Sequence, residues 1–149
     1  MDMPLEFHPA VKEKEIQAIY DHNIDAFSDS PDFKWNLEEI KNEIKGGWEL
    51  YSVSHDEEIV AALFVSIVDG KLYTKNTGLK IHHQGSGFSH EIKEFYENLA
   101  REKKLGRIIH YCRIDNFRMY SLNESHGYRK AENPIDEDGL VVEWTKFLE

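Results

Sequence analysis

The sequence predicts one mixed α/β domain in which about seven strands and four helices span residues 1–149. The length suits a single domain with a substantial core. A hydrophobic content of 40% and a charged content of 31% are typical of a globular protein. Segments with helical periodicity alternate with short runs of β-branched and aromatic residues, and repeats or linkers do not interrupt them.

In the first part of the chain, Leu5–His8 is predicted to be a short strand that Pro9 ends, and Val11–Phe27 to be a helix. Asn36 is suited to cap a second helix, which Gly46 and Gly47 stop. Each predicted helix has one apolar face, formed by Ile16, Ile19, Tyr20, Ile24 and Phe27 in the first and by Leu37, Ile40 and Ile44 in the second.

Three strands follow these helices. Trp48–Ser54 and Ile59–Val68 are predicted to pair, and the second of them is almost wholly apolar, which indicates a central strand. Asp69-Gly70 is a favoured two-residue hairpin turn. It leads into a strand predicted over Lys71–Ile81.

The second half of the chain is predicted to contain two further helices and three further strands. A helix is predicted from Phe88 to Lys104, with Gly106 after it, and another from Asn116 to Ser125, ended by Gly127. Three further strands are predicted at Arg107–Arg113, Tyr128–Ala131 and Leu140–Leu148.

The segment Leu79–Ala100 contains the clearest functional pattern, a strand followed by the loop Gln84-Gly85-Ser86-Gly87 and a helix. The first N–H groups of a helix lack partners, and the helix dipole adds positive charge there. Glycines let an anion approach the backbone closely. The segment therefore indicates a phosphate site, and glycines that only turn the chain are the alternative.

Two local patterns resemble one known family. Gln84-x-x-Gly87-x-Ser89 resembles the Q/R-x-x-G-x-G/A loop of GNAT acetyltransferases, which binds the pyrophosphate of acetyl-coenzyme A. The segment Asn116–Tyr128 resembles the family pattern N-x-x-A-x-x-L-Y-x-x-x-G-F and matches or nearly matches it at four positions. Met119 stands where a small residue is usual.

The resemblance implies a GNAT-like three-layer fold whose central sheet is mostly antiparallel. The strand before the loop and the strand Arg107–Arg113 would splay apart, and the pantetheine arm of acetyl-CoA would lie in the gap. Asn116 would contact that arm, although Asn is also a good helix N-cap. The implied cofactor-binding residues are Leu79, Lys80, Ile81, Gln84, Gly85, Ser86, Gly87, Phe88, Ser89 and Asn116.

The implied activity is direct transfer of an acetyl group from acetyl-CoA to a primary amine, on a small molecule or a protein. The family's usual Tyr acid is replaced by Asn123, whose amide does not release a proton near neutral pH. The family's alternative Glu is also absent, and Tyr73 is the closest position to it. Tyr120 lies one turn before Asn123. The candidate catalytic positions are Tyr120, Asn123 and Tyr73, with Lys75, Thr77, His110 and Tyr111 as further alternatives.

Two rival interpretations stay open. A GNAT-like domain that has lost its acid and base would bind acyl-CoA or a protein partner without turnover. An unrelated α/β domain would bind no CoA.

The charge and the composition of the chain limit the classes of partner that we expect it to bind. The net charge of −10 disfavours nucleic acid and favours a cationic acceptor. Asp25, Asp29, Asp32 and Trp35, between the first two helices, are candidates to meet it. We expect no metal and no membrane segment, because the histidines form no ligand pattern and no apolar run is long enough. The single Cys112 is expected to be buried on a strand and fits a reducing, cytoplasmic location. A homodimer is left open.

Overall fold

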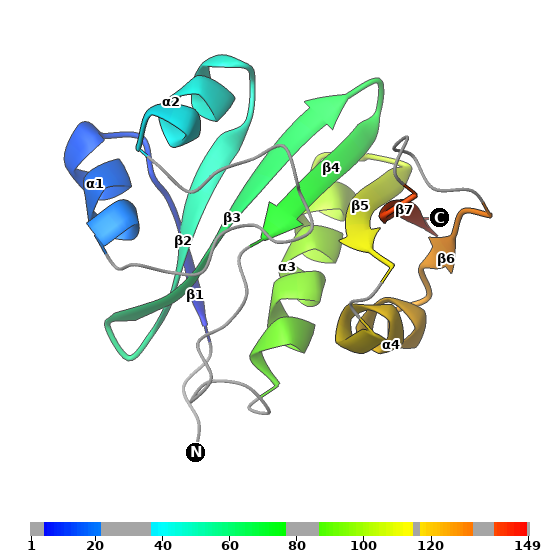
Figure 1. The fold of residues 1–149 in the computed structure, drawn as a ribbon. Helices are drawn as coiled ribbons and strands as arrows, with labels where there is room; N and C mark the ends of the chain where they lie inside the picture. The colour runs from blue at the N-terminus through cyan, green and yellow to red at the C-terminus, as the bar shows by residue number, and fades with distance from the viewer. Residues whose placement is uncertain (1–4, 22–36, 77–86, 115–116, 133–138, 149) are drawn as a thin grey trace.

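The structure of the protein, a computed structural model, describes residues 5–21, 37–76, 87–114, 117–132 and 139–148 (Figure 1). These residues include four helices, α1 (Glu13–Asp21), α2 (Leu37–Lys45), α3 (Phe88–Glu102) and α4 (Phe117–Ser125). The strands are β1 (Glu6–Pro9), β2 (Glu49–His55), β3 (Glu58–Val68), β4 (Lys71–Asn76), β5 (Arg107–Arg113), β6 (Arg129–Lys130) and β7 (Val141–Phe147). The mixed class predicted from the sequence is confirmed.

All seven strands form one sheet in the order β1-β2-β3-β4-β5-β7-β6. Neighbouring strands are antiparallel except β4 and β5, which run parallel. The pairing of β4 with β5 begins at Lys71 and Arg107 and ends at Thr74 and His110. Both strands continue beyond that point without pairing to each other in the described residues, and Figure 1 shows their carboxyl ends diverging. The predicted splay is confirmed.

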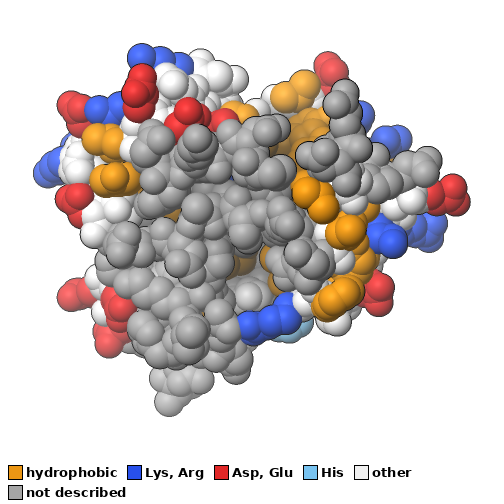
Figure 2. All heavy atoms as spheres, in the orientation of Figure 1, with side chains coloured by type: hydrophobic (Ala, Val, Ile, Leu, Met, Phe, Trp, Pro, Cys, Tyr) orange, Lys and Arg blue, Asp and Glu red, His pale blue; other side chains and the backbone are white. Residues whose placement is uncertain are grey.

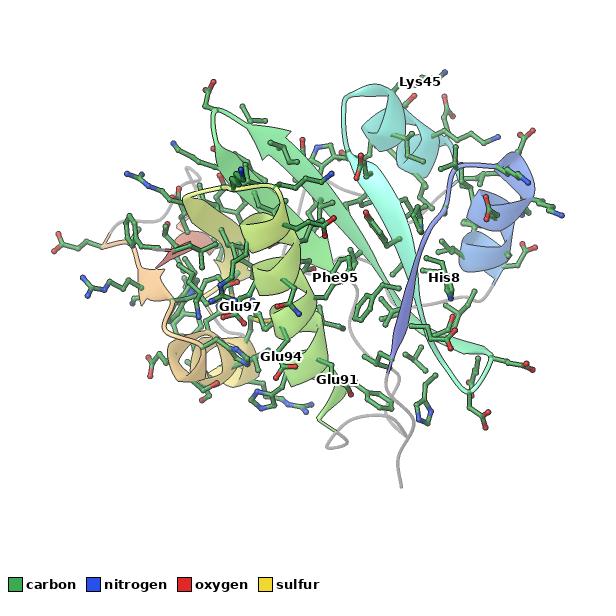
Figure 3. The ribbon with its side chains drawn as sticks, turned by 180° about the vertical axis from the view of Figure 1, so that it is seen from behind. His8, Lys45, Glu91, Glu94, Phe95 and Glu97 are labelled. Carbon is green, nitrogen blue, oxygen red and sulfur yellow. The ribbon has the colours of Figure 1, made fainter. Side chains whose placement is uncertain are left out.

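Helices cover both faces of the sheet. On one face, α3 packs through Phe88, Ile92 and Tyr96 in a core that includes Trp144 of β7. Figure 3 shows this face from behind, with α3 in front of the sheet. On the other face, Ile16 and Ile19 of α1 and Ile40 of α2 form a second core with residues of β2 and β3, namely Leu50, Ala62 and Phe64. The two clusters make the three layers that the sequence led us to expect.

Two boundaries at the start of the chain differ from the prediction. Helix α1 begins at Glu13 rather than Val11, because the Glu15 carboxylate accepts hydrogen bonds from the N–H groups of Lys12 (2.8 Å) and Val11 (3.3 Å) ahead of the helix. Pro9 does not break β1 but belongs to it, paired with Tyr51. The sheet tolerates this proline because β1 is an edge strand.

The end of α3 also differs from the prediction. The helix stops at Glu102, and Lys104 rather than a glycine takes the left-handed conformation, with φ 58°. The N–H of Leu105 then donates to the carbonyl of Ala100 at 2.8 Å, which closes the helix end. Strand β6 is shorter than predicted, and the other described boundaries agree to within one residue.

Candidate functional site

Helix α3 begins at Phe88, directly after Gly87, which is its N-cap and the last residue of the predicted phosphate loop. Gly87 has φ 83°, a conformation that L side chains rarely adopt, and no side chain caps the helix. A Cβ placed on Gly87 would meet no atom of the described residues within 4 Å. Phe88 is buried against the core and anchors the first turn, whereas Ser89 is half-buried. The first N–H groups of a helix point along its axis, and the helix dipole adds positive charge there, so this turn suits an anion.

The point where β4 and β5 part is held by a hydrogen-bonded pair. The Thr74 hydroxyl donates to the carbonyl of Ile109 at 3.0 Å, so its oxygen accepts from Nδ1 of His110, also at 3.0 Å. This fixes His110 as the Nδ1–H tautomer and leaves the lone pair on Nε2. Burial, and after it the nearby Lys93 charge, lowers the pKa of His110 well below its usual value. His110 is therefore neutral.

A buried polar layer lies between the sheet and helices α3 and α4, and we define it as His110, Asn123, Tyr128 and Trp144. These side chains are at most 4% exposed, and Asn123 is fully buried. The Nε2 of His110, both amide atoms of Asn123, the Tyr128 hydroxyl and Nε1 of Trp144 have no hydrogen-bond partner among the described residues. Such atoms are rare inside proteins and usually mark water or a ligand.

The three candidate catalytic residues do not lie together. The half-buried Tyr120 packs edge-on against Trp144, with ring centroids 5.0 Å apart, so it borders the same layer as Asn123. Tyr73 alternates with Thr74 along β4 and so faces the opposite side of the sheet. There its ring lies 6.4 Å from that of Tyr111. The pKa of the Tyr111 phenol is raised by burial first, and then by Glu143 and Tyr73.

The further alternatives are placed as follows. Lys75 forms an ion pair with Glu43 of α2 at 2.8 Å, on the same face as Tyr73. Cys112 is buried on β5, as predicted. Other predicted site residues lie outside the described part of the chain: Leu79, Lys80, Ile81, Gln84, Gly85, Ser86 and Asn116 for the cofactor, Thr77 as a catalytic alternative, and Asp25, Asp29, Asp32 and Trp35 for the acceptor.

The sequence analysis missed a charged cluster beside the buried polar layer. Glu97 of α3 is bound by Lys146 at 2.5 Å and by Nδ1 of His126 at 3.4 Å. His126 in turn hydrogen-bonds His90 through Nε2 at 2.9 Å. Figure 3 places Glu97 on the side of α3 nearer α4 and Phe95 on the side nearer β1. Lys93 and Glu97 each follow an apolar position of the α3 face by one residue, and this offset is the signal that could have identified them.

Two properties of the described residues concern metal binding and membrane insertion. No group of three or more His, Cys, Asp and Glu side chains gathers there in a way that could hold a metal ion. None of the described helices combines the length and apolar character needed to cross a bilayer. Hydrophobic side chains gather in Figure 2 over the region where Figure 1 draws α4 and β5. Phe117, the first residue of α4, is 71% exposed.

Comparison with known proteins gives a match in structure only. No protein-family model and no curated sequence matches the chain. The ribosomal-protein-S18-alanine N-acetyltransferase of Escherichia coli superposes with a TM-score of 0.74 at 13% identity, over 97% of this chain and 94% of that one. A GNAT acetyltransferase of Elizabethkingia anophelis, solved with acetyl-CoA bound, gives 0.73 at 18% identity, over 97% and 98%.

A third neighbour is a spermidine N-acetyltransferase of Vibrio cholerae, with a TM-score of 0.71 at 13% identity, over 96% of this chain and 93% of that one. These identities are low, but the superpositions cover nearly the whole of each chain. The protein has the fold of the GNAT acetyltransferases, as the two sequence patterns led us to expect.

Proposed function

We propose that the protein is an N-acetyltransferase that transfers the acetyl group of acetyl-CoA directly to a primary amine. One observation carries the proposal. The parallel strands β4 and β5 part directly after Thr74 and His110, within the fold of enzymes one of which was solved with acetyl-CoA. The gap between such strands can hold a narrow arm whose amides pair with exposed backbone groups.

The cofactor is proposed to bind with its pyrophosphate at the start of α3. The N–H groups of Gly87, Phe88 and Ser89 supply donors there, together with the predicted loop contacts of Gln84, Gly85 and Ser86. The pantetheine arm then runs into the gap beside Leu79–Ile81, as the sequence predicts. Asn116, which follows β5 in the sequence, is proposed to contact the arm from the other side, as the sequence predicts.

We propose that the amine approaches over one face of the sheet and that the departing thiolate is protonated from the other face. The amine approaches over the face with Tyr73 and Tyr111. Its nitrogen attacks the thioester carbonyl, and the C–S bond breaks with the electron pair staying on sulfur. The thiolate is a fair leaving group, with a pKa of about 8.5. Tyr120, on the other face, is the side chain that we propose donates a proton to it.

The acceptor is proposed to be cationic. A net charge of −10 attracts positively charged amines over a distance of several ångströms. Among the structural neighbours, the E. coli enzyme is named for an alanine of a ribosomal protein and the V. cholerae enzyme for spermidine. Polyamines and peptides with an N-terminal alanine are therefore the two classes to test first.

The test measures free thiol released from acetyl-CoA with each amine, beside calorimetric titration of CoA. We expect CoA binding and amine-dependent thiol release above the uncatalysed rate. The rival is an acyl-CoA-binding protein, which the fully buried amide of Asn123 at the usual Tyr position favours. CoA binding without turnover across polyamines, aminoglycosides, amino acids and peptides would support that rival. Absence of CoA binding would contradict both.

A further inference from the structure

The unpartnered atoms of the buried polar layer form a mixed set of donors and acceptors. The indole N–H of Trp144 only donates, and the locked Nε2 of His110 only accepts. The Asn123 amide and the Tyr128 hydroxyl do both. Because a cation or an anion would satisfy only half of such a set, water is the ligand that fits all of it. Without water, each of these groups would lose its hydrogen bonds to solvent on folding and gain none in return.

The fold brings His110 and Trp144 together at the end of the strand gap. They are directly opposite in the β5–β7 register and share one face, so their side chains are neighbours. His110 is also opposite Thr74, the last paired residue of β4. Asn123 and Tyr128 are joined by the Tyr128 N–H, which donates to the Asn123 carbonyl at 3.0 Å. Among the described residues, the charged or titratable groups around the layer include Lys93, Tyr96 and Glu97 from α3 and Tyr120 from α4. His126 and Lys146, which bind Glu97, lie beside them.

We propose that His110 is a positioning residue for acetyl transfer: it holds an internal water, shared with Trp144, that donates a hydrogen bond to the sulfur of coenzyme A. The inference rests on the proposed function. The loop before α3 follows the carboxyl end of β4. A pantetheine arm that starts there and enters the gap therefore places its sulfur at the deep end, beside Thr74 and His110.

The water has a defined part in the chemistry. It donates one hydrogen to Nε2 of His110 and accepts the indole N–H of Trp144. When the C–S bond breaks, the water keeps its second hydrogen and donates it as a hydrogen bond to sulfur, which stabilises the negative charge that develops there. Tyr120, from α4, gives sulfur its one proton and regains a proton from solvent, and the amine nitrogen loses its proton to solvent. Water and His110 are unchanged at the end of the step.

The test measures the thiol of bound coenzyme A and needs no acceptor. The protein is saturated with CoA, and thiolate is followed by ultraviolet absorbance and by its rate of alkylation with iodoacetamide across pH. A hydrogen bond to the thiolate favours the charged form. We expect about tenfold more thiolate than in free CoA at the same pH, as long as most of the thiol is protonated.

Three variants locate the effect, and thermal melts confirm that each is folded. His110→Met removes the acceptor and should lose the excess thiolate. His110→Gln is similar in size, keeps an amide oxygen and should retain most of it. Ile108→Val, on the same strand and face, controls for packing and should change nothing. If His110→Met does not fold, Trp144→Phe keeps an aromatic ring, removes the indole N–H together with part of the ring, and should lose the excess as well.

Two results would overturn the inference: a wild-type thiolate fraction equal to that of free CoA, or equal fractions in the Met and Gln variants. If His110→Met does not fold, an undiminished thiolate fraction in Trp144→Phe would also overturn the inference. Each of these leaves the proposed function standing as long as CoA binds and thiol is released. Failure of CoA to bind by calorimetry would instead remove the proposed function and the inference together.

Discussion

Asn123 stands where the resembled family usually has a tyrosine, and Tyr120 carries a phenol one turn earlier on α4. Asn123 points into the core, where a larger side chain would overpack the site at a cost of about 1–3 kcal/mol. Tyr120 is half-buried and keeps a phenol on the same helix, one turn earlier. The sequence identified both residues, but their different depths depend on how α4 packs against Trp144, which no local pattern contains.

Tyr120→Phe keeps the ring against Trp144 and removes the hydroxyl. If the phenol donates a proton to the thiolate, kcat should fall tenfold or more, within the usual range of about 10²–10⁴ for such groups. CoA affinity should be unchanged. Steady-state thiol release measures the first quantity and calorimetry the second. Tyr51→Phe, in β2, is the matched control, and equal rates for both variants would remove Tyr120 from the mechanism.

Gly87→Glu places bulk and negative charge where we propose the pyrophosphate binds. CoA affinity should fall at least tenfold, which is about 1.4 kcal/mol. The substitution also strains the backbone, because φ is 83°. Gly70→Glu controls for that strain, since Gly70 has φ 74° in the turn at the other end of β4. An equal loss of affinity in both variants would show that the loop is not the site.

At the level of elements, hydrophobic periodicity predicted each described helix and strand, because alternation and the 3.6-residue repeat are local. The features that were predicted wrongly or missed depend on side-chain contacts and on parts of the chain far away in sequence. The start of α1 is set by the Glu15 side chain, and the end of α3 by a lysine in the left-handed region. The burial of Lys93 and Glu97 arises from β7 and α4, far away in sequence, so α3 alone did not reveal it.

The C-terminus of α4 gives a prediction about stability. Gly127 has φ 81°, and the N–H of Tyr128 closes the helix on the carbonyl of Asn123. Gly127→Ala should lower the free energy of unfolding by about 1–2 kcal/mol, because alanine disfavours this conformation. Gly106→Ala, at a glycine without positive φ and with open space around it, should instead raise stability by about 0.4–1 kcal/mol. Urea denaturation measures both, and a loss at Gly106 equal to that at Gly127 would contradict this account.

For the whole molecule, the buried neutral His110 makes stability depend on pH. Burial lowers the pKa of His110, and it also lowers the pKa of the half-buried His126, although Glu97 beside His126 acts in the opposite direction. Unfolded histidine titrates near 6.5, so below that pH the unfolded chain binds more protons. The contribution of His110 to the free energy of unfolding should therefore be fully present above about pH 6.5. It should fall by up to about 1.4 kcal/mol per pH unit as the pH drops towards the lowered folded pKa.

His110→Gln removes one of these titrating groups. Its free energy of unfolding should therefore decline less steeply than that of the wild type as the pH drops below about 6.5. Urea denaturation at a series of pH values measures the two slopes. Parallel slopes would mean that His110 is not a buried neutral group in the folded protein.

The central claim is that this fold holds acetyl-CoA between β4 and β5, with the pyrophosphate at the start of α3. A crystal structure of the protein soaked with acetyl-CoA tests it most directly. We predict phosphate oxygens on the N–H groups of Gly87, Phe88 and Ser89, and the thioester beside Thr74 and His110. Acetyl-CoA bound at another surface, or no bound ligand at saturating concentration, would contradict the account.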